Sequence, residues 1–146
     1  MFVDVLLPAA RNRLATIGDD APLIEAARRL RSGVDILVVC RPAGLLRGVI
    51  TKTDVVAQIG QCQGSGCLAS AASCMTEDVA LCRAGDLLED LWSRMKERGL
   101  KNIPIVDQDG RPLGVLNARD MLQALLDESA WEESMMRDYV MGIGYR

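Results

Sequence analysis

The sequence predicts an α/β protein of the α+β type, built from two similar halves. Two observations lead to this prediction. The motif GVITKTDVV at residues 48–56 returns in altered form as GVLNARDML at residues 114–122. Around each copy, apolar and polar residues follow the same order, displaced by about 66 residues. Because a repeat of this length indicates a duplicated structural unit, we expect two pseudo-symmetric repeats, each a small sheet with two packed helices.

An amphipathic helix is predicted early in each half. Residues 22–30 carry apolar side chains at positions 23, 26, 27 and 30, and residues 87–95 carry them at positions 87, 88, 91, 92 and 95. This spacing places the apolar side chains on one face of a helix. The turns GDDAP and RAGD precede the two segments, and acidic residues of this kind are typical of helix N-termini.

Short apolar runs after each helix predict buried strands. The four expected strands are residues 35–40, 46–50, 102–107 and 113–116. Asp109-Gly110 is a hairpin signal, so residues 103–106 and 112–116 should pair antiparallel. A second helix is expected in each half, at residues 54–59 and 120–126. Each half should therefore contain strand, helix, strand, strand and helix in that order.

A small and polar stretch with several glycines, residues 60–73, separates the halves and predicts a linker. Neither half alone would bury much of its surface, so the two are expected to pack together. We divide the chain into a first repeat at 1–60, a linker at 61–74, a second repeat at 75–128 and a C-terminal helical extension at 129–146.

The composition argues against several functions. A net charge of -3 and an aromatic content of 3% do not fit a nucleic-acid surface. No apolar run reaches the roughly 18 residues of a membrane span, and the N-terminus does not resemble a signal peptide. We therefore expect a cytoplasmic protein that binds neither nucleic acid nor membrane.

Catalytic and metal chemistry are also hard to place. The chain has no histidine, which is the commonest general base and metal ligand. Its five cysteines lack the C-x-x-C pairs typical of zinc and redox sites. We predict no catalytic residues, no metal and no required cofactor. Reduced thiols are expected, although Cys62 and Cys67 in the linker leave a redox-sensitive pair open.

The segment Thr51-Lys52-Thr53-Asp54 stands where a predicted strand runs into a helix. Free backbone N–H groups and the helix dipole favour an anion such as phosphate there. Asp54 could accept hydrogen bonds from the two hydroxyls of a ribose. The alternative is that Thr51 and Asp54 only cap the helix. The return of the glycine and the aspartate at equal spacing favours a shared function, the binding of a nucleotide.

In these motifs the chain resembles a tandem pair of cystathionine-beta-synthase (CBS) domains, also called a Bateman module. The family pattern of Gly, apolar, x, Thr or Ser, x, x, Asp is met by residues 48–54. In the second copy, Asn117 stands where the family prefers Thr or Ser. The family's apolar-Pro-apolar-Val-Asp strand is met by residues 103–107, whereas residues 36–40 lack the proline.

The resemblance implies a stand-alone, non-catalytic regulatory module, with a role in energy sensing. It would bind AMP, ADP, ATP or S-adenosylmethionine between the repeats. Asp54 and, in the second copy, Asp120 would hold ribose. The residues implied to face phosphate are Thr51, Thr53, Lys101 and Arg119. The residues implied to lie near the base are Thr16, Ile17, Asn102, Ile103 and Pro104.

The C-terminal segment carries apolar side chains at spacings that suit a helical face, namely Trp131, Met135, Met136, Tyr139 and Val140. The helix either folds back on its own core or lies at a subunit interface, where Trp, Tyr and Met are enriched. The resemblance implies a homodimer and a separate target protein. The alternative function is a structural or adaptor dimerisation module that binds no ligand.

Overall fold

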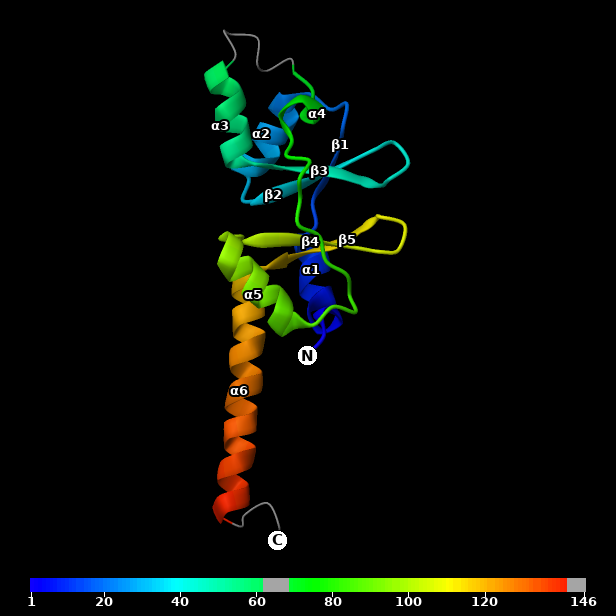
Figure 1. Ribbon diagram of the computed structural model, residues 1–146. Helices are drawn as coiled ribbons and strands as arrows, with labels where there is room; N and C mark the ends of the chain where they lie inside the picture. Colours follow the sequence, from blue (N-terminus) through cyan, green and yellow to red (C-terminus); the bar gives the residue numbers. More distant parts are fainter. Residues whose placement is uncertain (62–68, 142–146) are drawn as a thin grey trace.

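The computed structural model describes residues 1–61 and 69–141, without the side chains of residues 138–141. The chain forms two lobes, stacked one above the other in Figure 1, and a long helix that extends away from the lower lobe. Each lobe contains one small sheet covered by helices. The α/β fold with two small sheets and a C-terminal helix is therefore as predicted.

The upper lobe in Figure 1 is built around a three-stranded sheet of order β1-β2-β3. Its strands are β1 (Thr16–Gly18), β2 (Ile36–Cys40) and β3 (Leu46–Thr51), with β1 parallel and β3 antiparallel to β2. Its helices are α2 (Leu23–Arg31), α3 (Lys52–Gln61) and α4 (Ala71–Cys74). The predicted apolar face of α2 is confirmed, because Leu23, Ala26 and Leu30 are buried in the core of this lobe.

The lower lobe contains the predicted hairpin of β4 (Asn102–Val106) and β5 (Pro112–Asn117), paired antiparallel. Its helices are η1 (Val3–Leu6), α1 (Leu7–Arg13), α5 (Leu88–Arg98) and the first part of α6 (Ala118–Met141). The strand expected before α5 is absent from the described residues. Cys82 makes a single parallel bridge to Ile105, and a turn from Arg83 to Asp86 begins directly after it. The chain therefore leaves the sheet after one residue.

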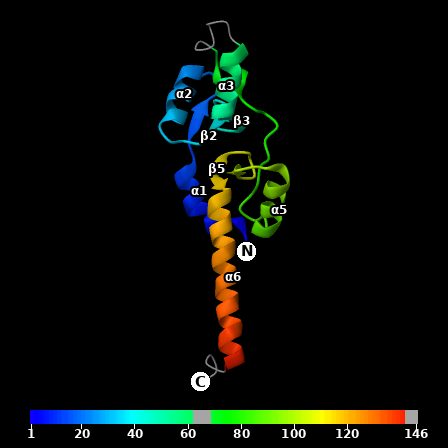
Figure 2. The ribbon, with the colours of Figure 1, turned by 90° about the vertical axis from the view of Figure 1, so that its left-hand side faces the viewer.

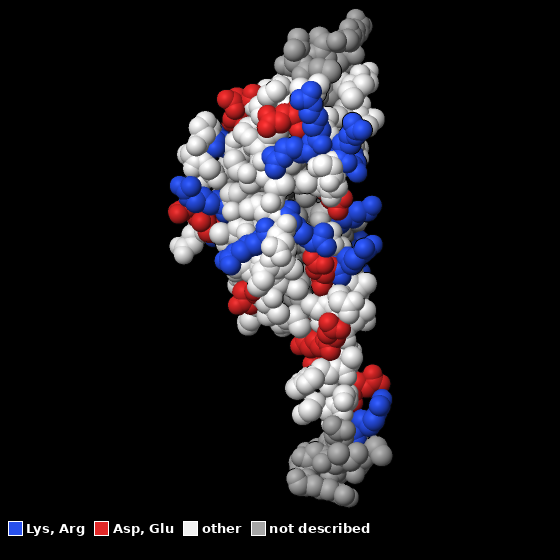
Figure 3. Space-filling view, turned by 180° about the vertical axis from the view of Figure 1, so that it is seen from behind, with Lys and Arg blue, Asp and Glu red and all other residues white. Residues whose placement is uncertain are grey.

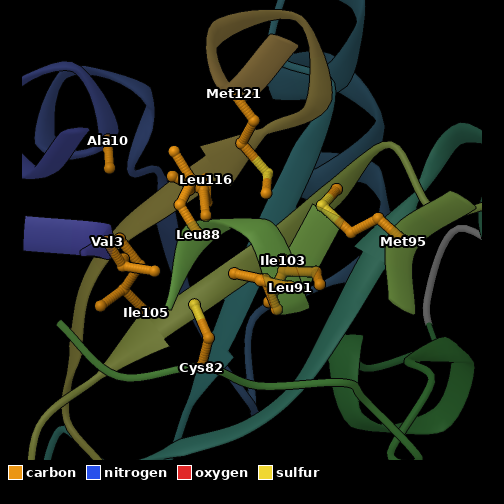
Figure 4. Packing of buried hydrophobic residues seen from close by; sticks show 10 residues of the cluster. All are labelled: Val3, Ala10, Cys82, Leu88, Leu91, Met95, Ile103, Ile105, Leu116 and Met121. Carbon is orange, nitrogen blue, oxygen red and sulfur yellow. The ribbon is translucent and has the colours of Figure 1, made fainter. Parts of the chain in front are cut away.

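The two lobes exchange segments of the chain. Helix α1 precedes β1 but packs on β5 in the other lobe, and both Figure 1 and Figure 2 place it there. Val3 and Ala10 are buried with Leu88 and Ile105 in one cluster (Figure 4). In return, α4 lies within the predicted linker and buries Ala71 in the core of the upper lobe. Neither helix was predicted from the sequence.

The sheets of the two lobes contact each other through a small apolar cluster. Ile36, Val38 and Val49 from the upper sheet are buried together with Val115 from β5. These side chains point away from the two lobe cores, because successive residues of a strand face opposite sides. The lobes are thus held face to face, as expected of halves too small to be stable alone.

Helix α6 runs unbroken over 24 residues, a length of about 36 Å. The predicted C-terminal extension is therefore a continuation of the last helix of the second half. The described part does not fold back on the core, since α6 projects beyond the lower lobe in both ribbon views (Figures 1 and 2). Trp131, Met135 and Met136 are exposed on it. The side chains of Tyr139 and Val140 lie outside the described residues, as do Cys62 and Cys67.

None of the helices in the described part of the chain is both long enough and apolar enough to cross a membrane.

Candidate functional site

A cleft of about 890 Å³ lies between the lobes, and both halves of the chain line it. This volume is within the range of roughly 300 to 1,000 Å³ that is usual for small-molecule sites. The first half contributes the β3–α3 junction and the start of β2. The second half contributes Thr76 and residues 78–80, the connection from α5 to β4, and the β5–α6 junction. The two junctions are the repeated motifs of the sequence.

Seven of the predicted site residues line this cleft. They are Thr51, Thr53, Asp54, Lys101, Asn102, Pro104 and Arg119. They come from β3, α3, β4, α6 and the connection before β4, which the pairing of β4 with β5 and the contact between the lobes bring together.

The other four predicted residues do not line it. Ile17 and Ile103 are buried in the two lobe cores. On β4 this follows from strand alternation, since Asn102 and Pro104 face the cleft and Ile103 faces the core. Thr16 is exposed, and its carbonyl oxygen accepts a hydrogen bond from the Arg29 guanidinium. Asp120 is bound to Arg13, as described below.

Asp54 both caps its helix and faces the cleft. Its Oδ2 accepts hydrogen bonds from the Thr51 backbone N–H at 2.8 Å and from the Thr51 hydroxyl at 3.1 Å. Its Oδ1 accepts a third from the hydroxyl of Thr76 at 3.0 Å. The capping alternative is therefore realised in part. Because a carboxylate offers about four acceptor positions, these three neutral donors do not exhaust Asp54.

The start of α3 gives the cleft an anion-binding character. Helix α3 begins at Lys52, directly after β3 ends at Thr51. The N–H groups of a first helical turn have no partner within the helix, and the dipole adds partial positive charge there. Thr53 adds a hydroxyl and Lys52 an ammonium group to the same end of the helix.

The opposite wall is set by the end of α5. Gly99 follows this helix in the left-handed conformation, with φ of 66°, and its N–H binds the carbonyl oxygens of Lys96 and Met95. Glycine adopts this conformation without strain, which explains the sharp end of the helix. The turn leads at once into Lys101 and Asn102, which both line the cleft.

At the second junction, the side chains of Asn117 and Asp120 already have hydrogen-bond partners within the protein. Asn117 donates to Asn102 Oδ1 at 3.0 Å through Nδ2, and its own Oδ1 accepts the Arg119 N–H at 2.9 Å. Asp120 accepts two hydrogen bonds from Arg13, at 2.6 Å from Nε and 3.1 Å from Nη2. The bond to Asp120 is the main reason that the pKa of Arg13 is raised. This junction thus differs from the first, where only neutral groups reach the aspartate.

Positive charge exceeds negative charge along the cleft. Its cationic residues are Arg13, Lys52, Arg98, Lys101 and Arg119, and its acidic ones are Asp35, Asp54 and Asp78. Apart from Arg13, none of these cations forms an ion pair within the described part of the chain. Figure 3 shows Lys and Arg concentrated along one edge of the body where the lobes meet. The described residues contain no His, Cys, Asp or Glu cluster suited to a metal ion.

Sequence reasoning missed several residues of the site, among them Arg13, Asp35, Thr76 and Asp78. Thr76 and Asp78 lie between the repeated motifs, where no pattern marked them. Arg13 belongs to α1, whose packing on the second half has no signal in the sequence. Only Asp35 stood next to a predicted feature, at the start of a strand.

Comparisons with known proteins agree with this architecture. The chain is 32% identical over 119 residues to the choline transport ATP-binding protein OpuBA of Bacillus subtilis, a match that covers 81% of this chain and 29% of that protein. It is 24% identical over 136 residues to an uncharacterised 17.7 kDa protein of Acidianus ambivalens, covering 92% and 81% of the two chains. The chain thus spans less than a third of the length of OpuBA.

Solved structures of CBS-domain proteins share the fold. A CBS-domain-containing protein of Agrobacterium tumefaciens aligns with a TM-score of 0.72 at 25% identity, over 84% of this chain and 92% of that one. CBSX2 in complex with AMP aligns with a TM-score of 0.76 at 22% identity, over 88% and 98%. The CBS domain pair of MJ0100, in complex with 5'-methylthioadenosine and S-adenosyl-L-methionine, aligns with a TM-score of 0.72 at 19% identity, over 88% and 98%.

The model of the CBS domain family matches the sequence twice, at residues 5–60 and 71–127. Each match contains one of the repeated strand-to-helix junctions that meet at the cleft. The chain therefore belongs to the CBS domain family, as a tandem pair of CBS domains.

Proposed function

We propose that this protein is a non-catalytic regulatory module that binds an adenine nucleotide in the cleft between its two CBS domains and signals to a separate protein. The observation that carries the proposal is the β3–α3 junction, where an aspartate with neutral partners and the start of a helix face one cleft. The AMP and S-adenosylmethionine complexes of the similar structures point to the same class of ligand.

Asp54 is the proposed ribose acceptor. A ribose hydroxyl can replace the Thr76 hydroxyl on Oδ1, because both are neutral donors of similar strength. The contacts of Thr51 hold the carboxylate in place meanwhile. A binding group that is already oriented by its neighbours loses little entropy when the ligand arrives.

Phosphate would bind at the start of α3, facing Thr51 and Thr53, with the Thr53 hydroxyl as a donor while the N–H and hydroxyl of Thr51 stay bound to Asp54. Lys101 and Arg119 are proposed as further phosphate partners, since neither forms an ion pair with another described residue. For the base, the cleft offers an apolar wall that includes Val49, Val79, Leu100 and Pro104. Asn102 lies beside this wall and supplies polar groups for the edge of the ring.

Signalling requires a ligand that favours one arrangement of the two domains over another. The ligand would bridge the lobes, because the cleft is lined by Asp54 from the upper lobe and by Asn102 and Arg119 from the lower lobe. Rearrangement of the lobes would move α6, which begins at the cleft and projects from the body (Figure 2). We propose that this helix serves a homodimer or transmits the change to the target protein.

The test is thermal unfolding with AMP, ADP, ATP and S-adenosylmethionine, each added separately. At a hundredfold excess over Kd a bound ligand stabilises the native state by about 2.7 kcal/mol, and a Tm rise on the order of 5 to 10 °C is expected. Asp54→Asn should remove most of this rise, since the amide offers one acceptor oxygen where the carboxylate offers two.

The matched control is Asp120→Asn, the same change at the equivalent position outside the cleft lining. This variant should keep the ligand-induced rise. If none of the four ligands raises Tm, the nucleotide proposal fails. The adaptor function would then be supported if a protein partner co-purifies and the oligomer size is the same with and without each nucleotide.

A further inference from the structure

The internal duplication predicts a second cleft, related to the first by exchanging the two halves. In this second cleft, residues 33–36 would take the place that residues 99–102 have in the first. The second strand-to-helix junction would take the place of the first junction. A cavity of about 190 Å³ lies against residues 33–36 and is also lined by Arg13 and Asn102, whereas the second junction contributes Asn117, Ala118 and Arg119 to the main cleft. This volume is below the range of about 300 Å³ and more that small-molecule sites require.

Arg13 lines this cavity as well as the main cleft, and it is the residue that binds Asp120. It lines the small cavity and holds both oxygens of Asp120, while Asp120 itself lines neither cavity. The side chain of Asp120 is 23% exposed. Asp35, which lines the same cavity, adds a second negative charge next to the guanidinium. Arg13 is thus bound to one acid, Asp120, and lies near a second, Asp35.

The contrast with Asp54 explains why the two positions behave differently. At Asp54 a ribose would exchange one neutral donor for another. At Asp120 it would have to displace a charged, two-pronged donor, and such bonds are roughly twice as strong as neutral ones.

We propose that Arg13 is an intramolecular plug that occupies the ribose position of the second CBS domain and restricts the protein to one adenine nucleotide per chain. The proposal rests on the proposed function for the nature of the ligand. The plug comes from α1, a segment of the first half that packs on the second. Its removal should open a second site at Asp120.

The experiment is isothermal titration calorimetry with AMP and, separately, with ATP, at protein concentrations that define the stoichiometry. The wild type should bind one nucleotide per chain. Arg13→Ala and Arg13→Gln should bind two, because each removes the charged fork while Asp120 remains. Arg13→Lys should still bind one, since its ammonium group keeps a charged bond to Asp120.

The double variant Arg13→Ala, Asp120→Ala should return to one nucleotide, which locates the added site at Asp120. Circular dichroism verifies that each variant is folded. Because both Arg13→Ala and Arg13→Gln remove the plug, the test can still be made if one of them does not fold. Two nucleotides per wild-type chain, or no added site in Arg13→Ala and Arg13→Gln, would overturn the plug.

The outcomes also separate this proposal from the proposed function. If the wild type binds nothing but Arg13→Ala binds one nucleotide that the double variant loses, the plug stands and the main cleft is not the native site. If no variant binds any nucleotide, both proposals are wrong. If the wild type binds one and Arg13→Ala also binds one, only the plug is wrong.

Discussion

Asp54 and Asp120 are equivalent in the sequence but not in their surroundings. The spacing of the motif identified both, and it placed Asp54 at a helix start that lines the cleft. Their partners could not be predicted. Thr76 is 22 residues away from Asp54, and Arg13 is 107 residues away from Asp120. A local motif identifies a carboxylate that could bind a ligand. Contacts with residues far away in the sequence decide whether that carboxylate is still free to do so.

Cys82 offers a test at the level of a single residue. It is buried in the lower lobe (Figure 4), and burial raises the pKa of its thiol to about 12. In the unfolded chain a thiol ionises near pH 8.5. The stabilising effect of this group is therefore complete below about pH 8.5, and it is lost as the pH rises toward 12.

Urea unfolding of the wild type should show this loss, on the order of 2 kcal/mol by pH 10. The control is Cys82→Ala, which has no thiol to ionise and should lose less stability between pH 7.5 and pH 10. Other groups titrate equally in both proteins, so the difference between the two pH profiles is the quantity to compare. Identical pH profiles of the two proteins would show that the Cys82 thiol is not the source of the stability lost at high pH.

Close contacts with neighbouring backbone explain why the repeated motif has glycine at the same position in both halves, as Gly48 and Gly114. A Cβ on Gly114 would lie 2.7 Å from the backbone carbon of Ala10 in α1, and one on Gly48 would lie 2.7 Å from the carbonyl oxygen of Thr76. In each case a segment from the other half crosses the strand at close range. The recurring glycine was visible in the sequence, but its reason was not.

Gly114→Ala should separate α1 from β5 and destabilise the protein by about 1 to 3 kcal/mol, as overpacking of a tight contact usually does. The control is Gly60→Ala in α3, where an added Cβ meets no atom within 4 Å. That change should stabilise the helix by up to about 1 kcal/mol. Chemical unfolding of both variants measures the difference, and equal stabilities would show that the contact does not matter.

Elements with a regular period were predicted well, and those fixed by distant contacts were not. The apolar spacing of α2 and the Asp109-Gly110 hairpin signal were sufficient for those elements. Helix α1 contains Pro8 and three residues that are charged or amide-bearing, which give no clear apolar period. The missing strand at Cys82 depends on the turn that follows it. The seven predicted site residues that line the cleft came from the repeated motif and the family resemblance, whereas Arg13 was missed because a distant contact places its helix.

At the scale of the whole molecule, α6 leaves large apolar side chains in solvent. Besides Trp131, Met135 and Met136, it exposes Leu122 and Leu126. Exposed apolar groups of this number on one projecting helix are typical of an interaction surface. We therefore keep the prediction of a homodimer, formed at least in part by this helix.

Analytical ultracentrifugation should give a mass twice that of the 15.9 kDa chain. Trp131→Glu combined with Met135→Glu should raise the dimer dissociation constant by tenfold or more, because the change buries charge at the interface. Ser129→Glu, which adds charge to the same helix at a polar position, should have a smaller effect. A monomeric wild type would rule the dimer out.

The exchange of segments between the lobes also affects folding of the protein during its translation. Val3 and Ala10 leave the ribosome roughly eighty residues before Leu88 and Ile105, their partners in the lower core, an interval of about 5 to 15 seconds at usual rates of translation. The core of the upper lobe likewise becomes complete only after Ala71 has been translated. The lower lobe therefore cannot finish folding until its hairpin has been translated, so the nascent chain keeps the apolar face of its first helix open to chaperones during this interval.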